Sequence, residues 1–269
     1  MTDLSVVIIT YESRALIEQC VGSVRAATHK VSYEIVVVEN GSSDGTAEWL
    51  RSQPDIRAIF NASNRGVAPA RNQGLAAAKG RYLMILDADT VVADGALDTL
   101  VARMDARPDA GLGAPKLTDA DGALQLTCRY YPTVFSKIYR RLPFEFAGKR
   151  LADEFLEGDP HDAETEIDYV IGACQIFRRE AYEKVGPLDE RIFYGPEDID
   201  YCIRMWAAGW KVVYFPQAVV KHLERRITKK LLSKTTFRHA AGLAYYFRKY
   251  GYLTNTAKLP GSKSSGNKR

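Results

Sequence analysis

Two aspartates separated by one residue, Asp87 and Asp89, follow directly after an apolar run over residues 82–86. Side chains alternate along an extended chain, so both carboxylates can face one point at the carboxyl end of a strand. Open α/β sheets bind their ligands at that end. Because two close carboxylates repel unless a cation or proton lies between them, the pair predicts a site for Mg²⁺ or Mn²⁺ with phosphate oxygens. The competing interpretation is a turn in which Asp89 or Thr90 caps a helix.

A second group, Asn64, Gly66 and Arg71, stands at the start of an expected helix over residues 66–79. The first N–H groups of a helix lack partners within it and favour an anion such as phosphate. Arg71, one turn further, can add a charge-assisted hydrogen bond to that anion. Helix capping with a surface arginine is the competing interpretation.

Glu197 and Asp198 stand in the first turn of another expected helix, where the helix dipole favours acids whatever the function. A base and a metal site are often supplied by different loops around one cleft, so this pair, far in sequence from Asp87, can supply a catalytic base. Asp200 is expected to face solvent. His222 either is structural or completes a metal shell, in which case its imidazole favours Mn²⁺ over Mg²⁺.

The chain around these groups alternates short apolar runs with amphipathic stretches, which is typical of successive β-α units on a mainly parallel sheet. Residues 117–166 lose this periodicity and are expected to form an excursion or a mobile lid. The expected strands lie at 4–10, 34–39, 56–60, 82–87, 169–178 and 211–215, the last stopped by Pro216, and the expected helices at 14–27, 44–50, 66–79, after Asp94, at 197–208 and at 228–250.

The 269-residue chain, with 46% hydrophobic and 26% charged residues, has the composition of a globular protein and excludes a disordered, collagen-like or coiled-coil chain. No apolar run approaches the roughly 18–20 residues of a membrane span, and the N-terminus lacks the basic residues of a signal peptide. We therefore expect a cytoplasmic protein. Its four cysteines form no C-x-x-C pair and are expected to be buried thiols.

Charge is unevenly distributed along the chain. Residues 221–269 carry thirteen Lys or Arg against one acid, whereas residues 1–220 carry 24 basic and 32 acidic residues. A basic C-terminal part predicts a polyanionic neighbour, and Tyr245, Tyr246 and Phe247 suit docking on an anionic membrane, at its inner face. A solvated helix face with a frayed tail is the competing interpretation, and nucleic acid is the less favoured polyanion.

Taken together, the order and spacing of these motifs resemble the inverting glycosyltransferase family 2, whose members have the GT-A fold, and most of all its bacterial rhamnosyltransferase-like branch. The resemblance implies an α/β fold with a Rossmann-like, mainly parallel central sheet flanked by helices and a basic helical C-terminal extension. It covers roughly residues 4–222 and rests on VVIITYES at 6–13, EIVVVENGSSDGT at 34–46, NRGVAPARNQG at 64–74, YLMILDADT at 82–90, IGACQIFRREAYEKVGPLDERIF at 171–193, PEDIDYCIRMWAAGWKVVYFP at 196–216, and His222.

The resemblance also implies a division of the chain. A GT-A domain would occupy residues 1–222, with a nucleotide-sugar-binding half at 1–116 and an acceptor-binding half at 117–222. A basic helical extension would follow at 223–257, and residues 258–269 are expected to be a disordered tail.

For the donor, the resemblance implies that Asp87, Asp89 and His222 bind Mn²⁺ or Mg²⁺, with the second acid of the Asp-x-Asp motif on the metal and the first nearer the sugar. The family has Asp where this chain has Glu39, one methylene longer, so a choice between uracil and thymine does not carry over. The residues implied to bind the nucleotide-sugar are Thr10, Tyr11, Glu12, Glu39, Asn40, Asn64, Gly66, Arg71, Asp87 and Ala88.

For the acceptor side, Glu197 and Asp198 match the Glu-Asp motif whose Asp is the catalytic base, and Gly172, Ala173 and Tyr194 are implied to bind the acceptor. The base takes the proton of an acceptor hydroxyl as that oxygen attacks C1 of the donor sugar, a single displacement that inverts the anomeric centre. The metal and the arginine of the second motif would stabilise charge on the leaving diphosphate.

The expected function is transfer of a sugar from a UDP- or dTDP-sugar, with dTDP-rhamnose among the candidates, to a hydroxyl of a saccharide or lipid-linked acceptor in cell-surface polysaccharide synthesis. The alternatives are a catalytically silent nucleotide-sugar-fold scaffold and a polyanion-binding module. A haloacid-dehalogenase-like phosphatase is disfavoured because its Asp-x-Asp motif would stand near the N-terminus. A sugar-phosphate nucleotidyltransferase would need a glycine-rich segment where residues 10–13 read TYES.

Overall fold

The computed structural model describes residues 2–139, 161–223, 234–251 and 255–263, and every structural statement below refers to these residues. In chain order the elements are β1 (Leu4–Thr10), α1 (Arg14–Ala27), β2 (Tyr33–Glu39), α2 (Thr46–Arg51), β3 (Ile56–Phe60), α3 (Val67–Ala77), β4 (Tyr82–Asp87), β5 (Thr90–Val92), α4 (Ala96–Ala106), β6 (Ala110–Thr118), β7 (Leu124–Gln125), β8 (Cys128–Arg129), α5 (Val134–Tyr139), β9 (Thr165–Glu166), β10 (Tyr169–Val170), β11 (Cys174–Arg178), α7 (Arg179–Val185), α8 (Glu197–Ala207), β12 (Lys211–His222) and α9 (Lys234–Tyr250).

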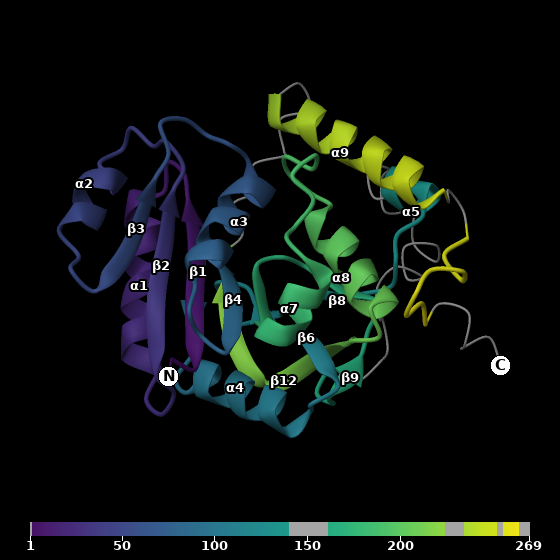
Figure 1. Ribbon diagram of the computed structural model, residues 1–269, viewed down its shortest axis with the longest axis horizontal. Coiled ribbons are helices and arrows are strands. Elements are labelled where there is room, and N and C mark those ends of the chain that lie inside the picture. The colour runs from purple at the N-terminus through teal and green to yellow at the C-terminus, as the bar shows by residue number, and fades with distance from the viewer. Residues whose placement is uncertain (1, 140–160, 224–233, 252–254, 264–269) are drawn as a thin grey trace.

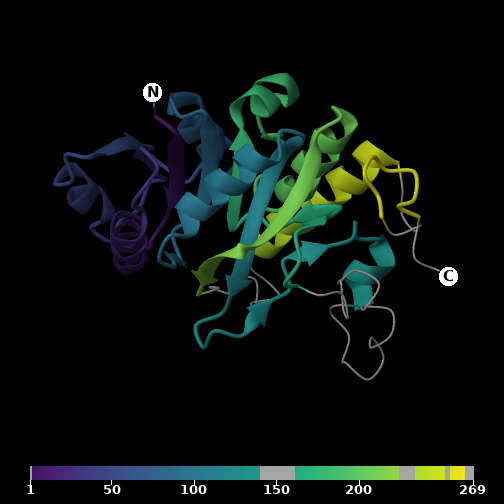
Figure 2. The same ribbon diagram turned by 90° about the horizontal axis from the view of Figure 1, so that it is seen from below.

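One long sheet runs through the molecule in the strand order β3-β2-β1-β4-β11-β6-β12-β5. Strands β1 to β4 run parallel to one another, β11 is antiparallel to β4 and β6, and β12 is again parallel to β6. Figure 2 shows β6 and β12 side by side in the second half of the sheet. An α/β fold with a central sheet flanked by helices, as the sequence predicts, is confirmed.

Hydrophobic side chains cover both faces of this sheet, which explains why the first strands read as nearly continuous apolar runs. In β1, Val6 and Ile8 pack in one core cluster with residues of α1 and α4, and Val7 packs in a second cluster with residues of α3. The parallel pairing of these strands places their polar carboxyl ends together at one edge. Thr10 of β1 lies opposite Glu39 of β2, and Ile9 lies opposite Asp87 of β4.

Several strands differ from the sequence predictions. The strand expected at 169–178 is divided in two: β10 pairs with β8 in a separate sheet, whereas β11 belongs to the central sheet. Strand β6 was not predicted, because its Gly- and Pro-containing sequence AGLGAPKLT shows neither alternation nor a β-branched run. A Cβ at Gly113 would lie 2.6 Å from the Phe215 ring, so close packing against β12 accounts for a glycine in a central strand. Strand β12 does not stop at Pro216: it passes this residue in a register shift between Phe215 and Val219 and continues to His222.

The C-terminal part packs against the body of the protein. In α9 the Tyr246 side chain is fully buried in the second core cluster, so its ring does not face outward as membrane docking would require, and Phe247 and Tyr250 are partly buried against the same cluster. The expected helix residues 228–233 lie outside the described residues.

The chain after α9 also contacts the body over part of the region expected to be disordered. The Tyr131 hydroxyl donates to the Pro260 carbonyl oxygen at 2.9 Å, and the Lys263 N–H donates to Asp168 at 2.7 Å. Residues 258–263 therefore have defined partners, and residues 264–269 lie outside the described residues.

Candidate functional site

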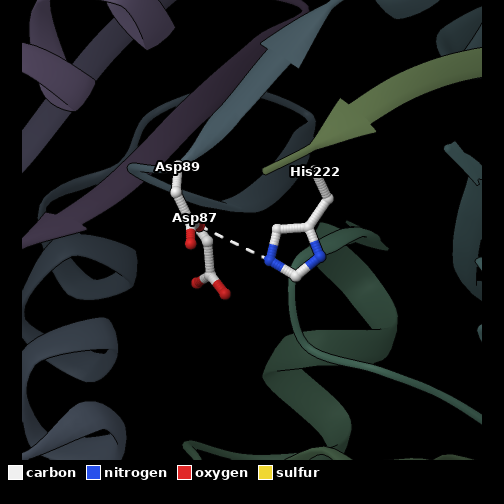
Figure 3. A group of neighbouring side chains, drawn as sticks. All are labelled: Asp87, Asp89 and His222. Carbon is white, nitrogen blue, oxygen red and sulfur yellow. Dashed lines mark ion pairs between the residues drawn. The ribbon is translucent and has the colours of Figure 1, made fainter. Parts of the chain in front are cut away.

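Asp87, Asp89 and His222 come together at the end of β4, in the turn that follows it and at the end of β12. One ligand atom of each lies within 4.8 Å of the others, and Figure 3 shows the two carboxylates and the imidazole facing the same space. The His222 Nε2 atom lies 3.5 Å from Asp89 Oδ1. The antiparallel pairing of β12 with β5, in which His222 lies opposite Thr90, brings the histidine to this point from 133 residues away along the chain.

The His222 ring is held by Gln125 of β7. The Gln125 side-chain amide donates to the His222 carbonyl oxygen at 2.8 Å, and its Oε1 atom lies 3.0 Å from His222 Nδ1. Since Oε1 can only accept, Nδ1 carries a proton and Nε2 is the ring nitrogen directed at Asp89. No signal in the sequence singled out Gln125, which stands in the stretch without periodicity.

Arg71 joins Asp87, the first acid of the Asp-x-Asp motif, to Glu197, the first acid of the Glu-Asp motif. Its guanidinium, 4% exposed, donates to Asp87 Oδ1 at 2.7 Å, to Glu197 Oε1 at 3.0 Å and to the Gly172 carbonyl oxygen at 2.8 Å. Sequence reasoning placed this arginine on phosphate alone. Its planar fork instead holds two carboxylates in fixed positions, so its first task is to position them.

Glu197 is buried beside this arginine. Burial has the largest effect on its carboxyl group and raises its pKa to about 7. The negative charges of Asp198 and Asp87 also raise this pKa, whereas the positive charge of Arg71 lowers it. Its second oxygen, Oε2, has no hydrogen-bond partner among the described residues.

Asp198 is more open than Glu197 and is held from two sides. Its Oδ2 accepts the Gly172 N–H at 3.2 Å, and its Oδ1 accepts the Ile199 N–H of its own helix at 2.8 Å. Gly172 therefore contacts both halves of the arrangement, since its carbonyl accepts from Arg71 and its N–H donates to Asp198. The two motifs expected to do chemistry thus meet around one backbone residue.

The remaining residues expected near the acceptor lie close to the same acids. Tyr194 is half-buried, and burial together with the negative charges of Glu197, Asp87 and Asp198 raises its pKa to about 12. Ala173 is buried, and its carbonyl oxygen accepts the Asp87 N–H at 2.9 Å. Ala88 is buried in the first core cluster.

A polar group at the ends of β2 and α3 matches the expected nucleotide-binding residues. The buried Glu39 accepts the Ser42 N–H at 2.6 Å. The Asn40 side chain donates to Asn64 Oδ1 at 3.2 Å and to the Gly66 carbonyl oxygen at 3.3 Å, and Asn64 Oδ1 accepts the Gly66 N–H at 2.9 Å. These bonds fix the loop before α3 against the end of β2.

The loop after β1 completes this group. Tyr11 is 47% exposed, which leaves an aromatic face open beside the buried Thr10. Glu12 has a positive φ of 49°, a conformation uncommon for a residue with a side chain, and its carboxylate accepts the Ser43 N–H at 2.9 Å. The loops that follow β1 and β2 are thereby joined.

The chain is similar to known proteins in both sequence and fold. Residues 5–186 match the model of the family described as Glycosyl transferase family 2. The N-acetylglucosaminyl-diphospho-decaprenol L-rhamnosyltransferase of Mycobacterium tuberculosis is 29% identical over 243 residues, which cover 82% of this chain and 76% of that protein.

Two solved structures share the fold. The crystal structure of GalNAc-T7 with UDP, GalNAc and Mn²⁺ superposes with a TM-score of 0.67 and 22% identity, covering 91% of this chain and 48% of the other. The mannosyltransferase PcManGT of Pyrobaculum calidifontis, in complex with GDP-Man and Mn²⁺, gives a TM-score of 0.60 and 22% identity, covering 92% of this chain and 63% of the other. This chain therefore spans about half the length of the first structure and under two thirds of the second.

Proposed function

The chain belongs to glycosyltransferase family 2, and from this premise we propose that it is a metal-dependent, inverting enzyme that transfers a sugar from a nucleoside diphosphate to an acceptor hydroxyl. One observation carries the proposal. The cluster of Asp87, Asp89 and His222 and the acid pair Glu197 and Asp198 are joined through a single buried arginine. An arrangement of this kind can hold a donor diphosphate and a proton acceptor side by side.

Asp87, Asp89 and His222 suit a divalent cation of the Mn²⁺ type. Carboxylates and one neutral imidazole are ligands that Mn²⁺ accepts, and the Nδ1 proton fixed by Gln125 leaves Nε2 directed at the cluster. A divalent ion bound there would stabilise the charge that develops on the leaving diphosphate. Both solved neighbours named above contain Mn²⁺, which supports the same choice.

Asp198 is the better candidate for the catalytic base. Its carboxylate is partly exposed and can meet an acceptor hydroxyl, whereas Glu197 is buried and paired with Arg71. Asp198 would take the proton as the acceptor oxygen attacks C1 of the sugar from the face opposite the diphosphate. We therefore assign Asp198 the proton transfer and Glu197 a positioning role, through Arg71, on Asp87.

For the donor, we propose a UDP- or dTDP-sugar held by the polar group of Glu39, Asn40 and Asn64, with the exposed Tyr11 ring beside the base. The Mycobacterium tuberculosis relative is named an L-rhamnosyltransferase, which favours dTDP-rhamnose among the donors. That name also specifies a decaprenol diphosphate carrying N-acetylglucosamine. A saccharide on a lipid carrier, as used in cell-surface polysaccharide synthesis, is therefore the acceptor class that we propose.

A lipid-linked acceptor would bring this protein to an anionic membrane surface, and its basic C-terminal part suits such a surface. No described helix combines the length and apolar character that a bilayer crossing needs. Tyr246 points into the core, and the most exposed aromatic side chain described in α9 is Phe237, 66% exposed, within a strongly basic stretch of sequence.

The decisive experiment measures donor binding and turnover separately. Titration calorimetry with UDP, dTDP, GDP and their sugars, with and without Mn²⁺, should give metal-dependent binding of one nucleotide class, lost in Asp89→Asn. Asp198→Asn should bind that donor as the wild type does and turn it over about 100- to 10,000-fold more slowly. Absence of binding across the whole panel would contradict the proposal and favour a catalytically silent scaffold.

A further inference from the structure

The acids of the Glu-Asp motif lie in a segment whose two ends are both bonded to the C-terminal helix α9. We call residues 189–200 the acidic segment; it contains Tyr194, Glu197 and Asp198. The Lys249 ammonium group of α9 donates to Asp189 at 2.9 Å and also to Asp200. A single cation thus joins the first and the last residue of the acidic segment.

Two tyrosines, one on each side of this lysine in the sequence, bind the same two aspartates. The Tyr245 hydroxyl donates to Asp189 at 2.8 Å, and the Tyr250 hydroxyl donates to Asp200 at 2.8 Å. Asp200 is fully buried rather than solvent-facing as the sequence suggested, and Arg204 of its own helix bonds its other oxygen at 2.9 Å. Because a buried carboxylate is costly without partners, these contacts fix where the segment ends.

The middle of the acidic segment packs closely against α9 at two glycines, Gly195 and Gly242. A Cβ at Gly242 would lie 2.5 Å from the Gly195 carbonyl oxygen, and a Cβ at Gly195 would lie 2.9 Å from His239 Nδ1. The His239 and Tyr194 rings meet edge to face with centroids 5.9 Å apart. Figure 1 shows α9 lying alongside α8 and the segment that leads into it.

From these contacts we propose that Lys249, with the Gly242 contact, positions the acidic segment and thereby sets the place of Asp198 relative to the donor site. This inference rests on the proposed function, in which Asp198 is the base. Helix α9 lies outside residues 5–186, the part matched by the family model. Lys249 touches no reacting atom and acts through Asp189 and Asp200.

A small shift of the acidic segment is enough to change the rate of the proposed reaction. A displacement of about 1 Å of a reacting group can lower a rate about 100-fold. The donor-binding groups of β1, β2 and β4 are held by the pairing of these strands. The acidic segment contacts this side through the bond between Arg71 and Glu197 and through the bond from the Val67 N–H to the Phe193 carbonyl oxygen. Loosening the acidic segment should therefore reduce turnover much more than donor binding.

The first test compares Lys249→Met with Arg248→Met, which removes the same charge from the neighbouring, exposed residue of the same helix. Lys249→Met should lower kcat about 10- to 100-fold. The donor dissociation constant in Mn²⁺ should rise by only about twofold, far less than kcat falls, and such a rise corresponds to less than one weak hydrogen bond. Amide hydrogen exchange should rise in peptides that cover residues 189–200. Arg248→Met should change none of these quantities, and Lys249→Arg should restore part of the rate.

A second variant tests the same inference without removing a buried ion pair. Gly242→Ala improves the helix propensity of α9 but places a methyl group against the Gly195 carbonyl, so a lower kcat with a preserved melting temperature would support the positioning role. Ala244→Gly, at an exposed position, is the control for changes in helix propensity.

The outcomes separate the two proposals. Unchanged kcat in both Lys249→Met and Gly242→Ala would overturn the positioning role, as would equal losses of kcat and donor affinity. Failure of the wild-type protein to bind any nucleotide in Mn²⁺ would instead contradict the proposed function itself.

Discussion

Gln125 holds His222 by both ends of its side-chain amide, through the histidine backbone carbonyl at 2.8 Å and through Nδ1 at 3.0 Å. The two residues come from β7 and β12, which do not pair with one another but flank the same end of β6. A histidine whose Nδ1 proton has a fixed acceptor keeps one tautomer and one ring orientation. The proposed binding of a metal ion by His222 would therefore depend on a residue outside the group of Asp87, Asp89 and His222.

We expect Gln125→Ala to weaken Mn²⁺ binding about tenfold, in line with the loss of a partner that orients a ligating histidine. Electron paramagnetic resonance of free Mn²⁺ measures this directly. Gln125→Glu keeps the acceptor for Nδ1 but loses the donor to the His222 carbonyl oxygen, so its Mn²⁺ affinity should lie between those of the alanine variant and the wild type. Equal Mn²⁺ affinities in the alanine variant and the wild type would show that Gln125 does not orient the ring.

Removing the charge of Arg71 should be strongly destabilising. Arg71→Met leaves Asp87 and the buried Glu197 without their shared partner, and breaking a buried pair from one side costs about 3–5 kcal/mol in the free energy of unfolding. Urea unfolding measures the loss. Arg65→Met, an exposed arginine just before the same helix, is the control and should change little. The double variant Arg71→Met with Glu197→Gln should recover part of the loss, and strict additivity of the two changes would argue against direct coupling.

Asp168 should make stability depend on pH in the mildly acidic range. Burial raises the pKa of Asp168 from 3.8 to about 6, although N–H groups of Tyr131 and Lys263 bond its charged form. The folded state then binds this proton more tightly than the unfolded state. Its stabilising contribution is complete below about pH 4 and is lost as the pH rises through about 6.

This contribution amounts to about 3 kcal/mol for a shift of about two pKa units. It is measured as the difference in free energy of unfolding between the wild type and Asp168→Asn at pH 4, 5, 6 and 7. The wild type should lose stability relative to the variant across this range. A difference that stays constant, or one that grows in favour of the wild type, would contradict the raised pKa.

Phe237 provides a test of membrane association that leaves the helix packing intact. Phe237→Ser should weaken binding to vesicles containing anionic lipid about tenfold or more, since an inserted Phe contributes about 1.5–3 kcal/mol. Phe60→Ser removes an exposed ring, 41% exposed, from β3 and should leave vesicle binding unchanged. Vesicle flotation at increasing salt should show release of the wild type, because the basic residues act through screened charge. Equal binding by both variants would remove Phe237 from the membrane contact.

Much of the donor half of the site could be predicted from the sequence, because local patterns determine it. The apolar runs that end at Thr10, Glu39 and Asp87 mark parallel strands, and parallel strands bring their carboxyl ends to one edge. The i, i+2 spacing of Asp87 and Asp89 then suffices to predict a shared site for a cation. These predictions depend on residues near one another in sequence.

The contacts between distant segments could not be predicted in the same way. Arg71 and Glu197 meet across 126 residues, and neither local pattern shows that the guanidinium would bind two carboxylates before any phosphate. Asp200 was expected to face solvent because acids at helix starts usually do, yet Lys249 and Tyr250 of a helix much later in the chain bury it. Aromatic residues in a basic helix favour a membrane by composition alone, and only the packing shows that Tyr246 belongs to the core.

The irregularity in β12 makes the group of Asp87, Asp89 and His222 sensitive to the number of residues between Phe215 and Val219 rather than to their types. Phe215 pairs with Pro115 and Val219 with the next residue, Lys116, so residues 216–218 are extra to the ladder. Because successive side chains of a strand point to opposite faces, a single-residue deletion there would turn the His222 imidazole away from Asp89. Substitution of the exposed Gln217 should therefore be tolerated, while its deletion should abolish the cluster. Insertions and deletions in this short stretch are thus expected to be far more restricted among functional variants than the exposed position of Gln217 suggests.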